Sequence, residues 1–503
     1  MLAKTESYTL IGLTGVPVSV EVDISNGLPS FDIVGLGDTA VKESKERIRS
    51  AIKNSGLSVP AKKIVCNLAP ADVKKEGSAF DLPLAVGLLK AFGMLSYPEE
   101  RIVFLGELSL DGSLRRVNGV LPILISALSD GYTKFIIPSG NKKEAAFVEN
   151  AEVYPAQSLK EVIDHLSGYK KLERVRTLDF EKEKSKKTYS EDLCFIKGQK
   201  VAKRALEVAV SGGHNILFVG APGTGKTMLA KCIPTIMPDM TKEEALETTK
   251  IHSKAGILKS SDGIVFTRPF RASHHTASTV SLTGGGAKIK PGEISLAHNG
   301  VLFLDEMPEY NRSTLEALRQ PLEDGVITVS RAEGSVLYPA NFMLCGSMNP
   351  CPCGNLGSED KPCTCSPSQI AKYKAKISGP LLDRIDIQVF VDSVKYSELT
   401  SDEKAETSET VRKRVNRVRD IQRKRFSSDG IYVNADMGER QIEKYCKLSK
   451  ECETILKNAY ESLGLSPRAR SRIIKVARTI ADMAESPEIL PKHILEAVSY
   501  RHG

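Results

Sequence analysis

The sequence has no tryptophan, and its aromatic residues make up only 6% of 503 residues. No aromatic platform for stacking single-stranded bases therefore stands out. Long apolar runs are also missing, because the best candidate for a membrane span, residues 80–95, is interrupted by Asp81, Pro83 and Lys90. The first ten residues, MLAKTESYTL, lack the apolar core and cleavage site of a secretory signal. We expect a cytoplasmic protein with no membrane partner.

Neither sign of charge dominates the chain. Its 70 Lys and Arg residues against 62 Asp and Glu residues give a net charge of +8. This mild excess allows an anionic partner such as nucleic acid without requiring one. A hydrophobic content of 41% is typical of a globular protein, and this length predicts about two to four domains. The ten cysteines are expected to be mostly free thiols, as in other cytosolic chains.

The order of apolar runs predicts an α/β protein that is divided into four regions. Strand-like and helix-like patterns alternate in residues 1–168, which predicts an α/β domain. Residues 169–191 are highly charged with few large apolar residues, so we expect a linker. Residues 192–394 contain the short apolar runs of a buried parallel sheet. Residues 395–503 are charged and mainly helical, apart from a short strand expected at GIYV, and we expect them to form a helical lid.

A phosphate-binding loop stands between the strand-like NILFV and the helix-like TMLAKCI, and it fits the pattern G-x-x-x-x-G-K-[ST]. Glycines let backbone N–H groups surround phosphates, and the N-terminal end of the following helix is positive. The pattern therefore predicts ATP binding, with Lys226 at the β- and γ-phosphates and Thr227 on Mg²⁺. The loop consists of Gly220, Ala221, Pro222, Gly223, Thr224, Gly225, Lys226 and Thr227.

An acidic pair completes the predicted hydrolytic site. The apolar run VLFL ends in Asp305 and Glu306, which places both carboxylates at the edge where open α/β sheets bind ligands. We expect Asp305 to hold Mg²⁺ through water and Glu306 to polarise the attacking water. Such a pair alone is weak evidence, because many strands end in acidic residues, but after a phosphate loop it indicates an ATPase.

Two further residues are candidates for contact with the γ-phosphate. Asn349 ends the apolar run NFMLCGSM, although Asn-Pro is also a common turn. Arg384 lies at a helix-to-strand junction in SGPLLDRIDI. From the residues alone, a surface ion pair with Asp383 or Asp386 is the favoured role of Arg384.

Several long segments carry a family resemblance: GHNILFVGAPGTGKT, PGEISLAHNGVLFLDEMPEY, LRQPLEDGVITVSRA, MNPCPCG, ISGPLLDRIDI and LSPRARSRIIKVARTIAD. They closely resemble the Mg-chelatase-like bacterial ATPases of the YifB/ComM family, over nearly the whole chain. The resemblance implies an AAA+ P-loop module of the helix-2-insert branch, assembled as a homo-hexameric ring. It also implies that Asn349 is sensor 1, that Arg384 is the arginine finger for a neighbour's ATP, and that Arg468 is sensor 2.

The resemblance further implies a function. Better-studied members of the family resemble DNA helicases that drive branch migration in natural transformation, which implies single-stranded or branched DNA as the partner. Two alternatives stay open: a chelatase-type motor that remodels a protein or tetrapyrrole complex, and a Lon-like protease.

The N-terminal domain, residues 1–168, resembles the Lon-protease fold, an α/β unit like ribosomal protein S5. A Lon-type protease needs a Ser nucleophile and a Lys. In the corresponding run EGSAF, the register that we prefer puts Ala79 at the nucleophile position and Leu121 near the Lys position, with Ser78 one residue away. We therefore expect no protease activity.

Four cysteines lie close together in the sequence as two C-x-C pairs, Cys351 with Cys353 and Cys363 with Cys365, separated by GNLGSEDKP. Four thiolates on a turn-rich loop are sufficient for a tetrahedral structural Zn²⁺ site. The alternative is four metal-free cytosolic thiols, because C-x-C is tighter than the usual zinc spacing.

Basic and histidine residues near the predicted site are candidates for DNA or subunit contact. His274 and His275 lie in the polar insert RASHHTASTVSLTGGGAKIKPGE, where we favour a pore-loop or subunit-contact role over ordinary loop histidines. The insert also contains Lys288 and Lys290, candidates for contact with phosphates of DNA. The basic run of residues 411–425 is a weaker candidate, because a charged helix is more often a solvated face of the lid.

Overall fold

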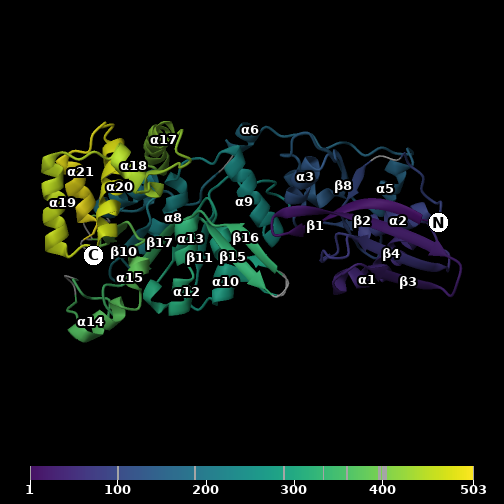
Figure 1. Cartoon of the computed structure of the whole chain (residues 1–503), viewed down its shortest axis with the longest axis horizontal. Helices are drawn as coiled ribbons and strands as arrows, with labels where there is room; N and C mark the ends of the chain where they lie inside the picture. Colours follow the sequence, from purple (N-terminus) through teal and green to yellow (C-terminus); the bar gives the residue numbers. More distant parts are fainter. Residues whose placement is uncertain are drawn as a thin grey trace. The chain divides into compact units, whose positions relative to one another are not determined.

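The computed structural model describes residues 2–98, 101–185, 188–286, 289–331, 334–357, 361–394, 398 and 405–501. The chain forms two compact units (Figure 1). The first comprises Met1–Lys186 together with Lys242–Phe266, and the second comprises Lys187–Thr241 together with Thr267–Gly503. Among the described residues, none of the helices combines the length and apolar character that a membrane crossing requires.

The first unit is built on a mixed seven-stranded sheet in the order β3-β4-β2-β1-β5-β8-β9. Antiparallel pairs join β1 to β2 and β2 to β4, and parallel pairs join the remaining neighbours. Its strands are β1 (Leu2–Ile11), β2 (Thr14–Ser25), β3 (Ser30–Val34), β4 (Lys63–Ala69), β5 (Ile102–Phe104), β8 (Lys134–Pro138) and β9 (Glu152–Ala156), with a small hairpin of β6 (Glu107–Leu108) and β7 (Leu114–Arg115).

Helices cover both faces of this sheet, because alternate strand residues enter different apolar clusters. Phe104 and Ile136 join the cluster that includes α1 and α2, whereas Val103 and Phe135 join the cluster that includes α3. The helices of the unit are α1 (Thr39–Asn54), α2 (Asp81–Ala91), α3 (Val120–Ser129), α4 (Lys142–Ala145), α5 (Leu159–Leu166), α6 (Phe180–Lys184) and α9 (Lys242–Ala255).

Two segments that the sequence analysis left outside the N-terminal domain pack within the first unit. Within the charged segment 169–191, Val175 donates its backbone N–H to Val153, and the Phe180 ring is buried. In α9, Ser253 donates from its hydroxyl to Glu144 and accepts from the backbone N–H of Gly119. The helix that follows the phosphate-loop helix in sequence therefore belongs to the first unit.

The second unit is built on a parallel five-stranded sheet in the order β11-β14-β17-β10-β18. Its strands are β10 (Ile216–Val219), β11 (Phe270–Ser273), β14 (Val301–Leu304), β17 (Met343–Met348) and β18 (Ile387–Phe390), with hairpins of β12 (Gly284–Gly285) and β13 (Lys290–Pro291), and of β15 (Val326–Arg331) and β16 (Gly334–Pro339). The predicted strands NILFV and VLFL are thus confirmed as β10 and β14. All four residues of each are buried, as expected for central strands of a parallel sheet.

Helices of the second unit fall into a group around the sheet and a C-terminal group that shares its apolar core. The first group is α7 (Lys200–Gly212), α8 (Lys226–Ile236), α10 (Thr279–Thr283), α11 (Glu293–Leu296), α12 (Arg312–Glu316), α13 (Arg319–Asp324), α14 (Pro367–Lys374) and α15 (Gly379–Leu382). The second is α17 (Ser408–Arg425), α18 (Glu439–Tyr445), α19 (Lys450–Leu463), α20 (Pro467–Met483) and α21 (Pro491–Ser499). Contacts of α17 and α20 with α7 join the two groups.

The strand expected at GIYV does not form. Residues 430–433 carry no strand assignment. Asn434, which follows them, is buried and hydrogen-bonded to Gln422 of α17 and Thr479 of α20. An apolar tetrapeptide needs a neighbouring strand to complete its hydrogen bonds, and here the neighbours are helices.

Candidate active site

The phosphate loop connects the carboxyl end of β10 to the first residue of α8. Gly223 and Gly225 have φ of +82° and +90°, a backbone region that favours glycine. A Cβ at Gly220 would lie 2.3 Å from the carbonyl oxygen of Val391, so this position also requires glycine. The loop therefore presents its backbone at the positive end of an eleven-residue helix, a geometry suited to an anion such as a polyphosphate.

Lys226 points into the curl of this loop. Its ammonium donates hydrogen bonds to the carbonyl oxygens of Gly220 at 2.7 Å and Ala221 at 2.8 Å. The side-chain oxygen of Asn349 lies 3.4 Å from the same nitrogen. Burial lowers the pKa of Lys226, and the charges of Asp305 and Glu306 oppose that shift. A buried ammonium surrounded by neutral carbonyls is well placed to exchange them for phosphate oxygens.

Asp305 and Thr227 meet from neighbouring elements. The Thr227 hydroxyl donates to Asp305 Oδ2 at 3.1 Å, and the Ser347 hydroxyl donates to Asp305 Oδ1. A hydroxyl and a carboxylate oxygen are the ligands that Mg²⁺ prefers. These residues therefore fit a magnesium ion, which Thr227 and Asp305 would hold. Ser347 is a contributor that the sequence analysis did not identify.

Glu306 has a strained backbone at the end of β14. Its φ of 51° and ψ of 49° lie in the left-handed region, which costs a non-glycine residue of order 1–3 kcal/mol and is often found at functional sites. The backbone N–H of Glu306 donates to Ser347 Oγ at 3.2 Å, which helps to hold this conformation. The Glu306 side chain is about half exposed and lies 3.7 Å from His275 Nδ1.

His275 is therefore a neighbour of the acidic pair, a position that the sequence analysis did not assign to it. The rings of His274 and His275 lie 4.1 Å apart because both residues are in a turn after β11. On a helix, adjacent side chains would point apart. The His275 ring also lies edge-on to Tyr310, whose hydroxyl donates to the carbonyl of Ser273. Only the strand order brings this turn beside Glu306.

Arg384 lies at the amino end of the strands of this sheet, opposite the carboxyl end that carries the phosphate loop. Its carbonyl accepts from the Asn215 side chain at 2.9 Å, and Asn215 immediately precedes β10, whereas the phosphate loop follows β10. The four residues of β10 span about 13 Å. The Arg384 guanidinium donates to the Pro380 carbonyl and forms an ion pair with Glu323 of α13. Neither Asp383 nor Asp386, the partners considered from the sequence, accepts these bonds.

Arg468 lies on the same side as Arg384. Its charge helps, after the larger contribution of Arg384, to lower the pKa of Glu323. The start of α20 is held near this edge by Arg472, whose guanidinium pairs with the buried Asp386 just before β18. Burial alone would raise the pKa of Asp386, but His214 and Arg472 hold it well below its usual range. We call Glu323, Arg384 and Arg468 the arginine edge, and the loop 220–227 with Asp305, Glu306 and Asn349 the phosphate edge.

Comparisons with known proteins cover the whole chain. Family models match residues 192–399 (magnesium chelatase, subunit ChlI), 20–141 (subunit ChlI of Mg-chelatase) and 405–501 (magnesium chelatase, subunit ChlI C-terminal). The competence protein ComM of Haemophilus influenzae is 43% identical over 99% of this chain and 97% of its own length, and so is the protein YifB of Salmonella typhimurium. The chain belongs to the YifB/ComM family of Mg-chelatase-like AAA+ proteins.

A weaker similarity links this family to a replication protein. The maternal DNA replication licensing factor mcm6 of Xenopus tropicalis is 22% identical over 309 residues, which cover 59% of this chain and 33% of that protein. Family membership makes the chain an AAA+ α/β protein with the ATP-binding and ATPase character of that class. The helix-2-insert branch, the lid and the Lon-like domain stay predictions.

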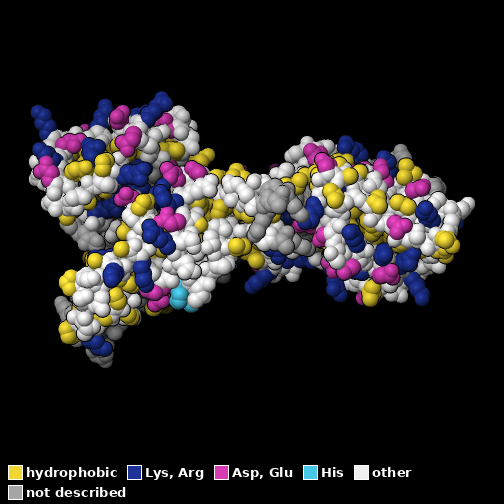
Figure 2. Space-filling model, turned by 60° about the horizontal axis from the view of Figure 1, so that its bottom comes forward, with side chains coloured by type: hydrophobic (Ala, Val, Ile, Leu, Met, Phe, Trp, Pro, Cys, Tyr) yellow, Lys and Arg dark blue, Asp and Glu magenta, His cyan; other side chains and the backbone are white. Residues whose placement is uncertain are grey.

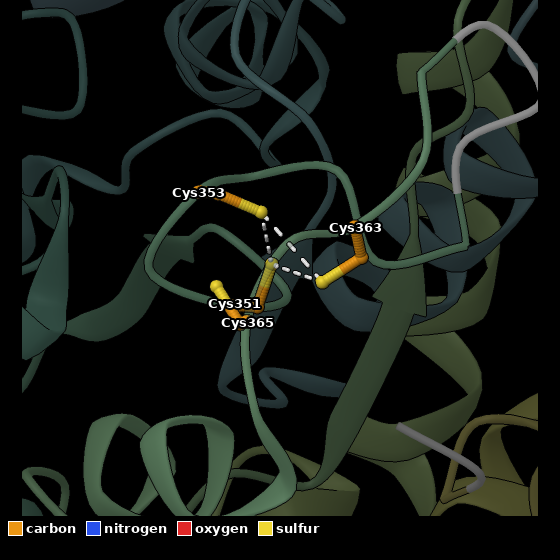
Figure 3. Close-up of side chains that lie close together, drawn as sticks. All are labelled: Cys351, Cys353, Cys363 and Cys365. Carbon is orange, nitrogen blue, oxygen red and sulfur yellow. Dashed lines mark hydrogen bonds between the residues drawn. The ribbon is translucent and has the colours of Figure 1, made fainter.

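The four cysteines of the YifB/ComM-family chain converge on one point (Figure 3). Their sulfur atoms all lie within 4.8 Å of one another, and Cys351 lies 3.3 Å from Cys353 and 3.6 Å from Cys363. Tetrahedral zinc–thiolate coordination places sulfurs about 3.8 Å apart. Backbone hydrogen bonds from Asn355 and Thr364 lower the pKa of Cys353 to about 5. The four side chains therefore fit one metal ion.

The basic run of residues 411–425 forms most of α17, and several of its arginines are occupied within the second unit. Arg414 pairs with Glu207 and Glu406, Arg425 pairs with Asp482, and Arg412 donates to the carbonyl of Thr235. The exposed members include Lys413, Arg417 and Lys424. Of the two insert lysines, Lys290 is exposed and Lys288 lies outside the described residues.

Proposed function

We propose that this chain is a Mg-ATP-driven DNA translocase that works as a hexameric ring in DNA uptake or recombination. The observation that carries the proposal is the separation of the phosphate edge from the arginine edge by the length of β10. An arginine at the far edge cannot reach the γ-phosphate bound by its own chain. A complete site therefore requires the phosphate edge of one chain and the arginine edge of another.

The proposed roles follow from the contacts at the phosphate edge. Lys226 exchanges its two carbonyl partners for the β- and γ-phosphate oxygens and neutralises their charge. Thr227 and Asp305 would hold Mg²⁺, and the ion would supply electrostatic stabilisation of the developing charge. Glu306 takes up the proton of the attacking water, and Asn349 holds that water or the γ-phosphate in place. His275 positions the Glu306 carboxylate.

The arginine edge supplies the remaining charge. Arg384 of a neighbouring chain stabilises the transferring phosphoryl group, and Arg468 acts beside it. Arg384 pairs with Glu323, and the charge of Arg468 also acts on that carboxylate, so we place both arginines on the same surface. Arg384 also borders a surface hollow lined by Glu316, Arg319, Gln320, Glu323 and Asp324, which is suited to a neighbouring chain.

DNA as the partner rests on similarity and charge. The Haemophilus influenzae relative is named a competence protein, and its similarity extends over the full length of this chain. Lys and Arg side chains gather on part of the second unit, with Asp and Glu side chains beside them (Figure 2). The exposed Lys290 and the outward lysines and arginines of α17 are the phosphate contacts that we propose.

The test of this function is the ATPase rate of the full chain with single-stranded, duplex and forked DNA at stated salt. We expect stimulation that declines with rising salt, because phosphate contacts release counterions. A rate that is the same with and without every DNA would exclude the DNA translocase and leave the ATPase intact.

A chelatase-type motor is the second candidate, favoured by the family models for the ChlI subunit of magnesium chelatase. Such a motor would be stimulated by a partner protein or a tetrapyrrole complex and not by DNA. The same assay with these additions separates the two candidates.

A Lon-like protease has less support. Ala79 is partly buried in an apolar cluster and Leu121 is fully buried, so neither position offers a nucleophile or a base. Ser78 donates its hydroxyl to the carboxylate of Glu107. Casein cleavage that disappears in Ser78→Ala would be required to revive this candidate.

We also propose one structural Zn²⁺ in the four-cysteine centre, because four thiolates close the coordination sphere. Metal analysis of protein purified without chelator should give about one zinc per chain. Cys363→Ser with Cys365→Ser should remove it, whereas Cys194→Ser, at a half-buried cysteine outside the centre, should not. A stoichiometry near zero in the wild-type protein would exclude the zinc site.

A further inference from the structure

The four-cysteine centre adjoins the phosphate edge through its first turn. Asn349 comes directly after β17, and Cys351 follows it by two residues. The turn is closed by a hydrogen bond of 3.0 Å from the Gly354 N–H to the Cys351 carbonyl. A Cβ at Gly354 would lie 2.7 Å from Cδ of Pro222, so this turn is in close contact with the phosphate loop.

The second cysteine pair leads into α14, and this helix brings the chain close to Asn349 again. Cys365 immediately precedes Ser366, which caps α14 together with Gln369. The last turn of α14 carries Tyr373, which is buried; burial raises the pKa of its hydroxyl, and the nearby backbone N–H of Asn349 opposes part of that rise. Asn349 therefore lies close both to the first cysteine pair and to the helix that begins after the second pair.

A bound metal ion would link the first cysteine pair to the second. Cys353 and Cys363 are ten residues apart, and their sulfurs lie 3.6 Å apart without a disulfide. Four thiols this close together can all lose their protons when a cation binds, because the cation offsets the repulsion between the thiolates. Metal coordination would crosslink the two C-x-C pairs and restrict the loop between Asn349 and α14.

We propose that the four-cysteine centre is a positioning element of the ATP site, in which a bound Zn²⁺ fixes Asn349 and the phosphate loop at Pro222, so that ATP turnover depends on metal occupancy. This inference rests on the proposed zinc site and ATPase function. It assigns to the centre a role in catalysis beyond holding the loop folded. The effect should be on kcat, because Asn349 is proposed to act on the γ-phosphate or the attacking water.

The test compares metal content, steady-state ATPase kinetics and ADP affinity in four variants of the full chain. Cys363→Ser with Cys365→Ser should lose the metal and lower kcat about tenfold or more, with ADP affinity changed less than about threefold, because ADP has no γ-phosphate. Cys194→Ser should match the wild type. Tyr373→Phe and Gly354→Ala should keep the metal. Tyr373→Phe should lower kcat about three- to tenfold, because the hydroxyl beside the Asn349 backbone is lost, and Gly354→Ala should lower kcat or ATP affinity through its clash with Pro222 and the strain of a non-glycine residue at φ +80°.

The outcomes separate the linked proposals. Wild-type protein that is active but contains no metal would overturn both the zinc site and this inference, with the ATPase unaffected. Wild-type protein that contains zinc but has no ATPase activity would instead overturn the ATPase function. Full kcat and KM in the double cysteine variant would overturn the positioning role and leave a structural zinc. If the double cysteine variant does not fold, Tyr373→Phe and Gly354→Ala decide, because wild-type kinetics in both, with metal bound, would also overturn it.

Discussion

The phosphate edge and the arginine edge belong to the same five-stranded sheet, yet they are held in different ways. At the phosphate edge, Lys226 is hydrogen-bonded to Asn349, and Thr227 is hydrogen-bonded to Asp305. At the arginine edge, Arg384 is paired with Glu323 of its own chain. The phosphate edge is therefore already arranged to receive its ligand. At the arginine edge, by contrast, the Arg384 guanidinium is paired with the Glu323 carboxylate, which occupies the place that we propose for a phosphate.

Under the proposed function, this difference assigns the control of hydrolysis to the arginine edge. A preformed phosphate edge can bind nucleotide in an isolated chain. An arginine held by an exposed carboxylate must exchange that partner before it can contact a phosphate. We therefore expect nucleotide binding to be a property of one chain and turnover to be a property of an assembly.

Removing the central charge of the phosphate edge should affect nucleotide binding, the step on which every later step depends. Lys226→Ala should lower ATP affinity by roughly 100-fold or more, because charge-assisted hydrogen bonds to the phosphates are lost. Isothermal titration with ATP measures this. Lys231→Ala, at an exposed lysine of the same helix, is the matched control with the same change in charge. Equal affinity in the Lys226→Ala and wild-type proteins would refute the phosphate edge as the nucleotide site.

Removing the arginine-edge charge should affect turnover alone. Arg384→Ala should bind ATP normally and lose on the order of 10³- to 10⁵-fold in kcat, the magnitude of an arginine finger. Arg423→Ala, at a surface arginine paired with Asp420, should stay near wild type because exposed pairs contribute little. Mixing Arg384→Ala with Lys226→Ala protein should restore part of the activity.

Complementation tests whether the two edges act from different chains. A site that pairs an intact Lys226 with an intact Arg384 forms only between unlike chains in such a mixture. Mixed assemblies that stay inactive despite confirmed association would argue against action in trans. An active Arg384→Ala protein would return this residue to a structural role.

A smaller loss is expected from the acidic pair. Glu306→Gln should keep ATP affinity and lower kcat by about 10²- to 10⁴-fold, because only the group that takes up the proton of water is changed. Glu309→Gln, three residues away and paired with Lys376 at the surface, is the control. Turnover that is undiminished in Glu306→Gln would remove Glu306 from the mechanism.

The smallest effect should come from Glu323, the carboxylate that pairs with Arg384 within the same chain. Glu323→Gln removes the charge that holds Arg384, and an exposed ion pair contributes about 0.2–1 kcal/mol, so ATPase activity at limiting protein concentration should rise roughly 1.4- to 5-fold. Glu316→Gln, which removes a neighbouring pair with Arg319, should have no such effect. A tenfold fall in activity would mean instead that Glu323 positions Arg384 for its target.

The sequence alone was sufficient to locate the phosphate edge. Local patterns placed the loop and the acidic pair after apolar runs, and the general rule for parallel sheets predicted that strand ends meet at one edge. Both strands are present with these residues at their carboxyl ends. The prediction succeeded because each motif depends only on residues adjacent to it in the chain. The roles of the individual residues stay predictions.

Only the tertiary structure decided which distant residues meet. The order β11-β14-β17-β10-β18 brings His275 to Glu306 and places Arg384 at the far edge, beside Glu323. It also assigns α9 to the first unit, although its sequence neighbour α8 belongs to the second. These contacts join residues 31 or more positions apart. Local periodicity carries no information on such pairs, because burial of apolar surface and strand pairing across the whole unit determine them.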